Sequence, residues 1–192
     1  MAVQRQKEQI RKRLLDQRQA ISFKEWETSS KIIIEKLKQL SIFRAAKTVH
    51  CYVSINERRE VNTHPLIKEM IAGEKKVIIS RTKFADESLS HFELHSFDDL
   101  SPNKWGVLEP VKGEKAVISE IDLVIVPMVG GDEKCNRIGY GGGFYDRFLK
   151  DVFCSKVGLC FEQNIIEKLP IEPFDIPLDM IVTEGRIIGV KV

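Results

Sequence analysis

Apolar residues recur at helical spacing in two stretches near the amino end of the chain. Residues 3–20 are expected to form one helix, with Ile10 and Leu14 on the same face. Ser22-Phe-Lys-Glu25 is a capping box, so a second helix should begin there. The apolar stripe of that second helix consists of Trp26, Ile33, Leu37 and Leu40.

Short apolar runs elsewhere predict strands. Residues 121–128 (IDLVIVPM) are the most apolar run and should form a central strand. A third helix is expected to begin at Asn62-Thr63, just before Pro65, and to end near Gly73. The other expected strands are residues 48–55, 76–80, 89–95, 156–160, 180–183 and 187–192. Because strands alternate with helices, we expect an α/β fold with a largely parallel sheet covered on both faces.

Length, composition and charge narrow the class of protein. The chain has 192 residues, which suits one domain with a real core, and no repeat or linker divides it, so we take residues 1–192 as a single domain. A net charge of +2 is too small to argue for a nucleic-acid partner. No apolar run approaches the ~18 residues of a spanning helix, and the first residues lack the apolar centre of a signal peptide. We therefore expect no membrane association. The four cysteines form no CxxC pair, which favours free thiols and a cytoplasmic location.

A glycine-rich loop follows the expected central strand, in residues 135–149 (CNRIGYGGGFYDRFL). A helix over residues 144–151 should follow it. Such a loop lies where ligands bind in α/β folds, and its bare N–H groups and the helix dipole favour an anion, most often phosphate. Neither common phosphate motif fits, because no Lys-Ser or Lys-Thr follows the glycines and Phe144 stands where the dinucleotide fingerprint needs glycine. A purely structural turn is the competing interpretation.

Two charged residues flank these glycines. Asp146 would suit Mg²⁺ beside bound phosphate, since Mg²⁺ is held by one or two carboxylates together with phosphate oxygens and water. The alternative is a first-turn aspartate that stabilises the helix dipole. Arg137 could bind phosphate through two hydrogen bonds from its planar guanidinium group, or could be a solvated loop residue.

Residues 136–146 (NRIGYGGGFYD) resemble the signature of the 5-formyltetrahydrofolate cyclo-ligase family, also called methenyltetrahydrofolate synthetases. Further similarity lies in Lys7, Arg11, Glu60-Val-Asn-Thr63, Lys104-Trp-Gly-Val-Leu-Glu-Pro110, and Asp175-Ile-Pro-Leu-Asp179 before Ile181-Val-Thr-Glu184. The resemblance implies a three-layer α/β/α fold with a largely parallel central sheet, as in sugar-phosphate isomerases and CoA transferases. It also implies ATP-dependent cyclisation of 5-formyltetrahydrofolate to 5,10-methenyltetrahydrofolate, with Mg²⁺ and with release of ADP and phosphate.

The resemblance further implies roles for individual residues. ATP would be held by Lys7, Arg11, Arg137, Ile138, Gly139, Tyr140, Gly141, Gly142, Gly143, Phe144 and Tyr145, with the helix over residues 3–20 packed at the nucleotide site. The folate site would be lined by Val53, Glu60, Trp105 and Tyr145. Asp146 and Asp179 would serve Mg²⁺, and Arg137 and Tyr145 would act in catalysis.

The sequence departs from the family pattern at three places. Tyr140 stands where some members carry Arg, so one phosphate contact is expected to be missing. Phe144 replaces the first Tyr of a Tyr-Tyr-Asp version, which removes a hydroxyl. Residues 56–59 look longer than in some members, which leaves open the alignment of Val53 and Glu60.

Two other classes of function stay open. A sugar-phosphate isomerase or deaminase on the same fold would bind phosphate without ATP, and it gives no role to Trp105 or to the basic first helix. A non-catalytic phospho-ligand sensor or RNA-binding module would need aromatic residues interleaved with a basic stripe, and the stripe of Lys7, Arg11 and Arg18 has none. On the cyclo-ligase interpretation the partners are 5-formyltetrahydrofolate and ATP, and the protein is expected to be a monomer.

Overall fold

A seven-stranded sheet forms the centre of the protein, with strand order β12-β11-β9-β6-β1-β2-β3. The computed structural model describes residues 2–73 and 75–189. Within the sheet β2, β1, β6, β9 and β11 are parallel, whereas β3 and β12 are antiparallel edge strands. Its strands are β1 (Thr48–His50), β2 (Lys76–Lys83), β3 (Ser88–Leu94), β6 (Leu123–Val126), β9 (Ser155–Leu159), β11 (Met180–Val182) and β12 (Ile187–Gly189). The largely parallel sheet expected from the sequence is confirmed.

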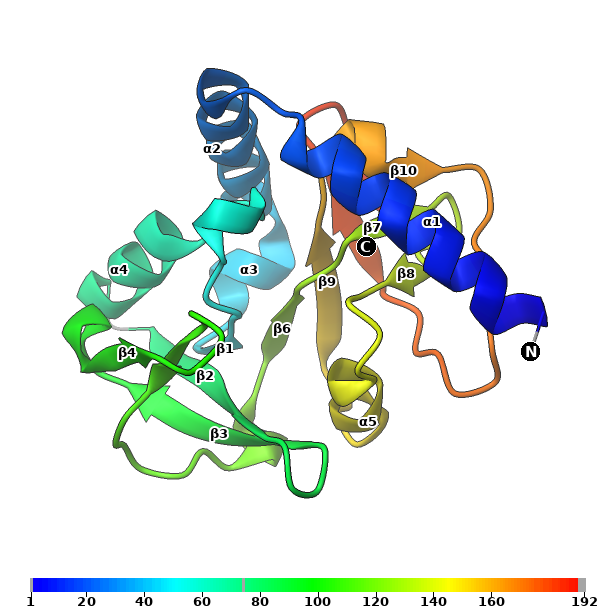
Figure 1. Ribbon diagram of the computed structural model, residues 1–192. Helices are drawn as coiled ribbons and strands as arrows, with labels where there is room; N and C mark the ends of the chain where they lie inside the picture. Colours follow the sequence, from blue (N-terminus) through cyan, green and yellow to red (C-terminus); the bar gives the residue numbers. More distant parts are fainter. Residues whose placement is uncertain (1, 74, 190–192) are drawn as a thin grey trace.

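Helices cover both faces of this sheet, with α2, α3 and α4 on one side and α5 on the other (Figure 1). The helices are α1 (Ala2–Gln19), α2 (Phe23–Gln39), α3 (Ser41–Ala45), α4 (His64–Ala72) and α5 (Phe144–Lys150). There are also two small sheets. The first has three strands in the order β10 (Ile165–Ile166), β7 (Gly130–Asp132) and β8 (Arg137–Ile138). The second pairs β4 (Leu100–Pro102) with β5 (Leu108–Pro110). Short 3₁₀ turns are η1 (Asn56–Arg58), η2 (Phe97–Asp99), η3 (Ile118–Glu120) and η4 (Glu162–Asn164). The arrangement is the expected three-layer α/β/α fold.

The alternation of side chains along each strand explains why both faces need helices. Val77 and Ile79 of β2 pack with α2, α3 and α4, whereas Ile78 between them packs on the opposite face with α5. In β6, Leu123 and Ile125 pack on the first face and Val124 and Val126 on the second. Since every residue of β6 is buried, the strand reads in the sequence as a continuous apolar run.

Most expected elements appear with shifted ends. The Ser22 hydroxyl accepts the Glu25 backbone N–H at 3.2 Å, so the predicted cap of α2 is confirmed. The helix predicted near Pro65 is α4, with Gly73 at its carboxyl cap. The strand predicted over residues 48–55 ends at His50, because the chain then leaves the sheet. The strand predicted over 187–192 is described as β12 to Gly189, and residues 190–192 lie outside the described part.

Helix α1 lies beside the small sheet rather than on the main one (Figure 1). Its Leu14 is fully buried in a cluster with Val129, Ile138 and Leu169. Since Ile138 ends β8, this cluster sets α1 next to the glycine-rich loop that follows. Across the described helices, none combines the length and the apolar character that crossing a membrane requires.

Candidate active site

A cavity of about 410 Å³ opens at the carboxyl ends of the parallel strands. Tyr52 and Val53 follow β1, Ser80 lies in the second half of β2, and the segment after β6 supplies the glycine-rich loop. Helix α1 closes the cavity beside that loop with Lys7 and Arg11. This is the edge of the sheet where open α/β folds bind ligands, as the sequence predicted for the loop.

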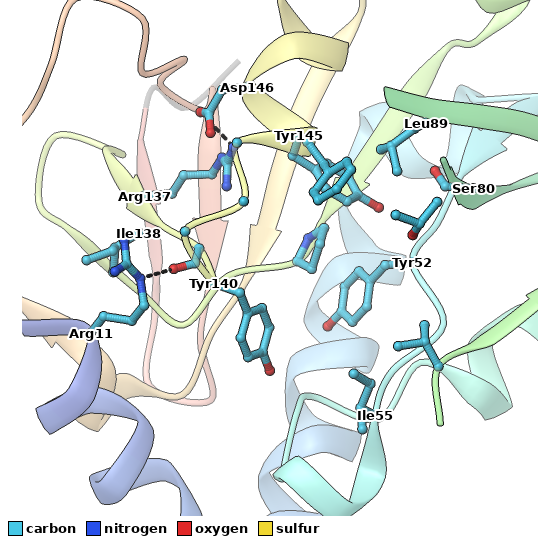
Figure 2. A pocket seen from close by; sticks show the side chains of 18 of the residues that line it. Arg11, Tyr52, Ile55, Ser80, Leu89, Arg137, Ile138, Tyr140, Tyr145 and Asp146 are labelled. Atoms are coloured by element: carbon cyan, nitrogen blue, oxygen red, sulfur yellow. Dashed lines mark hydrogen bonds and ion pairs between the residues drawn. The ribbon is translucent and has the colours of Figure 1, made fainter. Parts of the chain in front are cut away.

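The glycine-rich loop, residues 139–143, connects β8 to the amino end of α5. Gly141 has φ +98° and Gly143 has φ +67°, values that favour glycine. The Arg11 Nε donates to the Gly139 carbonyl oxygen at 2.7 Å (Figure 2), and a methyl group on Gly141 would come within 3.2 Å of the Arg11 guanidinium carbon. The loop is therefore held close to a cation of α1 and presents almost no side chains.

Arg137 and Asp146 form an ion pair at the base of the loop, with 2.7 Å between Nη2 and Oδ1 (Figure 2). The Arg137 side chain is 5% exposed, which excludes the solvated alternative, and its Nε has no hydrogen-bond partner among the described residues. Asp146 lies in the first turn of α5 and also lines the cavity. Asp146 therefore both orients a buried guanidinium and presents a carboxylate to the cavity.

Lys7 is buried and lines the cavity, but carboxylates surround its ammonium group. Its Nζ lies 3.0 Å from Glu172 Oε2 and 2.5 Å from Asp175 Oδ2. Both acids precede β11 and also line the cavity. They hold Lys7 in place and offset its charge before any anion binds.

Asp179 does not reach the cavity, so the sequence prediction that placed it beside Asp146 is wrong. It immediately precedes β11, at the amino end of a parallel strand, whereas the cavity opens at the carboxyl ends. Its Oδ2 accepts the Lys156 backbone N–H at 2.7 Å, at the start of β9. The acidic segment singled out in the sequence does contribute to the cavity, but through Asp175.

A second part of the cavity is lined by aromatic rings and by the buried carboxylate of Glu60. Val53 and Glu60, which the resemblance assigns to a folate site, both line it together with Tyr52 and Tyr145. Glu60 is only 5% exposed. Its Oε2 accepts the Ile55 backbone N–H at 2.7 Å, and its Oε1 accepts the hydroxyl of Tyr140. A buried carboxylate held at both oxygens still has free lone pairs for N–H groups of a ligand.

The three tyrosines at the cavity are neutral hydrogen-bond donors at physiological pH. Burial raises the pKa of Tyr52, Tyr140 and Tyr145 well above the usual value, because the charged phenolate would lose hydration. For Tyr140 the neighbouring charge of Glu60 raises the pKa further. None of these hydroxyls is therefore suited to act as a general base near neutral pH.

Trp105 does not line the cavity, contrary to the sequence prediction. It is 44% exposed, and its ring stacks on Phe84 with 3.9 Å between centroids. Phe84 does line the cavity, and Phe144, the first residue of α5, packs edge-to-face with it at 5.9 Å between ring centroids. Trp105 therefore packs behind Phe84, and Phe84 supplies the aromatic surface of the cavity.

Comparison with known proteins identifies the family. Residues 3–184 match the model of the 5-formyltetrahydrofolate cyclo-ligase family. The chain belongs to this family. It is 34% identical over 148 residues to the 5-formyltetrahydrofolate cyclo-ligase of Escherichia coli K12, which covers 74% of this chain and 80% of the relative. The NMR structure of Aquifex aeolicus 5,10-methenyltetrahydrofolate synthetase superimposes with a TM-score of 0.84 at 35% identity, covering 95% of this chain and 92% of that one.

Two further relatives widen the comparison. The mouse 5-formyltetrahydrofolate cyclo-ligase is 24% identical over 188 residues, covering 91% of this chain and 92% of its own. The Mycoplasma pneumoniae synthetase shares the fold at 22% identity with a TM-score of 0.75. Because cyclo-ligases are ATP-dependent ligases, membership favours this class over the isomerase, deaminase and non-catalytic alternatives.

Several cavity residues of this family member were not identified from the sequence. Glu172 lies just before the acidic segment, so it had a partial signal. Arg18, from the basic stripe on the first helix, does not line the cavity itself but bonds the hydroxyl of Tyr140, which does. Ser80 and Phe84 had none, because they reach the cavity only through the antiparallel pairing of β2 with β3, which extends to Lys83. The Tyr140 side chain points to Glu60 rather than to the loop backbone, so it does not replace a phosphate-binding arginine.

Proposed function

We propose that this protein converts 5-formyltetrahydrofolate and ATP to 5,10-methenyltetrahydrofolate, ADP and phosphate in the cavity described above. The observation that carries the proposal is the continuity of two chemically different ends within one cavity. One end is a glycine loop flanked by Arg11 and Lys7, which suits a polyphosphate. The other end has aromatic rings and the buried carboxylate of Glu60, which suits a pterin with its flat apolar faces and N–H edge.

The chemistry requires activation of a poor leaving group. The formyl oxygen of 5-formyltetrahydrofolate attacks the γ-phosphorus of ATP, and ADP departs. The neighbouring N10 then attacks the formyl carbon, loses its proton and closes the ring. Phosphate leaves with the former formyl oxygen, which yields the methenyl cation. Catalysis of this sequence consists mainly of positioning the two substrates and neutralising phosphoryl charge.

We assign the phosphate-binding role to the loop and its cations. The backbone N–H groups of residues 139–143 and the amino end of α5 offer hydrogen bonds to phosphate oxygens, with Ile138 and Phe144 as the flanking side chains. Arg11 lies at the loop carbonyl, and Arg137 is held beneath the loop by Asp146. Tyr145, partly buried and protonated, is placed to donate its hydroxyl to the reacting groups.

The donor set fits Mg²⁺ through a single protein carboxylate. In the described residues no cluster of three or more His, Cys, Asp or Glu side chains could enclose a metal ion. Asp146 nevertheless faces the phosphate-binding end, and Mg²⁺ in such sites is held by one or two carboxylates, phosphate oxygens and water. When bound there, Mg²⁺ would neutralise phosphate charge. Asp146 would then hold Arg137 and the metal at once.

We further propose that the protein acts as a cytoplasmic monomer. The loop, the cations of α1 and the carboxylate of Glu60 all come from one chain, so the cavity needs no residue from a second copy. Size-exclusion chromatography with light scattering, run with and without ATP and folate, tests the monomer directly. A dimer that forms only with substrates would overturn it.

Formation of the methenyl product tests the proposed activity. Its absorbance should rise when 5-formyltetrahydrofolate and Mg-ATP are both present, with one ADP released per product formed. Arg137→Lys keeps the charge but loses the planar fork, so it should lower turnover strongly. Arg186→Lys alters an exposed arginine paired with Glu133 and Glu162 and is the matched control. Product formation at an equal rate without ATP would contradict the proposal.

A further inference from the structure

Tyr140 connects the two ends of the cavity through its hydroxyl. The residue belongs to the glycine-rich loop, yet its hydroxyl donates to Glu60 Oε1, 2.5 Å away. Arg18 Nη2 donates to the same Tyr140 oxygen, also at 2.5 Å. Although 39% of the Tyr140 surface is exposed, its hydroxyl lies between two buried charged side chains, since Arg18 is 3% and Glu60 is 5% exposed.

The direction of these hydrogen bonds follows from the groups involved. A guanidinium can only donate, so the Tyr140 oxygen accepts from Arg18 and its hydrogen is free to point at Glu60. The second Glu60 oxygen accepts the Ile55 N–H at 2.7 Å, so both oxygens act as acceptors, as in an ionised carboxylate. Hydrogen bonds to a charged group are shorter and stronger than neutral ones.

Arg18 is itself fixed by the protein backbone. Its Nε donates to the Arg58 carbonyl at 3.0 Å and its Nη1 to the Met128 carbonyl at 3.3 Å. Among the described residues no carboxylate forms an ion pair with Arg18, so its positive charge is directed at Glu60 through the Tyr140 hydroxyl. The relay thus joins the end of α1, the glycine-rich loop and the segment after β1.

We infer that Tyr140 is a positioning residue that holds Glu60 for the pterin and couples the pterin end of the cavity to the nucleotide end. Glu60 keeps free lone pairs on both oxygens, and these can accept two N–H groups of the pterin edge only while the carboxylate is held in one orientation. Because Tyr140 moves with the loop that binds phosphate, ordering of the loop by ATP also orders Glu60. This inference rests on the proposed function.

Tyr140→Phe tests the relay, because it removes one oxygen and keeps the ring. The binding of 5-formyltetrahydrofolate is measured by calorimetry, alone and with a non-hydrolysable ATP analogue. The variant should bind folate about tenfold or more weakly, the scale of a lost hydrogen bond to a charged group. It should bind the analogue nearly as wild type when folate is absent. The increase in folate affinity that the analogue produces in wild type should disappear.

A double-mutant cycle separates positioning from a structural role. Glu60→Gln removes the charge on which Tyr140 acts, so adding Tyr140→Phe to it should cost little further folate affinity. Thr183→Val is the matched control, since the Thr183 hydroxyl also bonds a carboxylate, that of Glu162, outside the cavity. It should lower the melting temperature without changing either affinity.

Two results would overturn the inference. If Tyr140→Phe lowers the melting temperature but keeps wild-type folate affinity and coupling, the hydroxyl only fastens the loop. If its cost in folate affinity is the same in the Glu60→Gln background, Tyr140 does not act through Glu60. In both cases wild-type protein still forms the methenyl product with ATP. A wild-type protein that neither binds folate nor forms product would instead contradict the proposed function, and the inference with it.

Discussion

Replacing each glycine of the loop by alanine separates backbone strain from ligand exclusion. Gly141 and Gly143 have φ of +98° and +67°, so alanine there is strained whether or not a ligand binds. Gly142 has no such φ, and its added methyl group would meet only the Phe144 ring, at 2.8 Å. That ring is half-buried at the cavity and can shift. Gly142→Ala is therefore the variant whose loss of stability should appear mainly when ATP binds.

The expected magnitudes differ enough to be measured. Alanine in a left-handed conformation costs about 1–2 kcal/mol, and each kcal/mol shifts Tm by roughly 2–4 °C in a domain of 150–250 residues. Gly141→Ala and Gly143→Ala should therefore melt roughly 2–8 °C below wild type without ligand, and Gly142→Ala by less. ATP at about 100 times its Kd stabilises wild type by about 2.7 kcal/mol. Gly142→Ala should lose most of that gain, and its turnover should fall about 100-fold.

Thermal melting with and without Mg-ATP, together with turnover, is the assay. Gly106→Ala is the matched control for strain, because Gly106 has φ +77° and its added methyl group would touch nothing within 4 Å. It should melt lower but keep the full ATP shift. If Gly142→Ala also keeps the full shift and normal turnover, phosphate does not approach the loop backbone, and the loop is a structural turn.

Three further predictions concern other parts of the site. Asp146→Asn should lower the melting temperature without ligand, because the buried Arg137 loses its ionic partner, and should also raise the Mg²⁺ concentration needed for half-maximal turnover. Wild-type turnover at limiting Mg²⁺ would contradict the metal role of Asp146. Phe84→Ala should raise the KM for folate more than the KM for ATP. Trp105→Ala should raise the folate KM by a smaller factor, because the Trp105 ring contacts Phe84 and does not line the cavity. A larger increase in folate KM for Trp105→Ala than for Phe84→Ala would contradict this prediction. Burial lowers the pKa of His91 from 6.5 to about 4, so the folded state favours neutral histidine, and this stability is present above pH 6.5 and lost as pH falls toward 4. Between pH 7 and 4, His91→Phe should thus lose less unfolding free energy than wild type, by up to about 3 kcal/mol, as measured by urea unfolding. An equal loss in the variant and in wild type would contradict this role of His91.

Local signals account for the parts of the fold that the sequence predicted well. The capping box at Ser22, the Pro65 start of α4 and the apolar run of β6 each depend on residues close together in the chain. The glycine-rich loop was recognisable for the same reason, since its position after β6 and before α5 follows from the order of elements. Lys7 and Arg11 reach the cavity because the helical spacing that places them on one stripe is also local.

The errors arose where the site depends on long-range geometry. Asp175 and Asp179 are four residues apart in one acidic segment, but only the strand direction shows that Asp179 faces the wrong edge of the sheet. Phe84, and not the predicted Trp105, lines the cavity, because the path of a long irregular loop cannot be predicted from its composition. The bond between Tyr140 and Glu60 joins residues 80 positions apart and needs the whole fold to bring them together.

The central claim is that ATP activates the formyl oxygen of the folate in this cavity, and the fate of that oxygen tests it most directly. 5-Formyltetrahydrofolate labelled with ¹⁸O in the formyl group is converted in unlabelled water, and the released phosphate is analysed by mass spectrometry. If the γ-phosphoryl group is transferred to the formyl oxygen, each phosphate carries one ¹⁸O atom, and ADP carries none. Unlabelled phosphate, with ¹⁸O released to water while the methenyl product forms, would contradict the account.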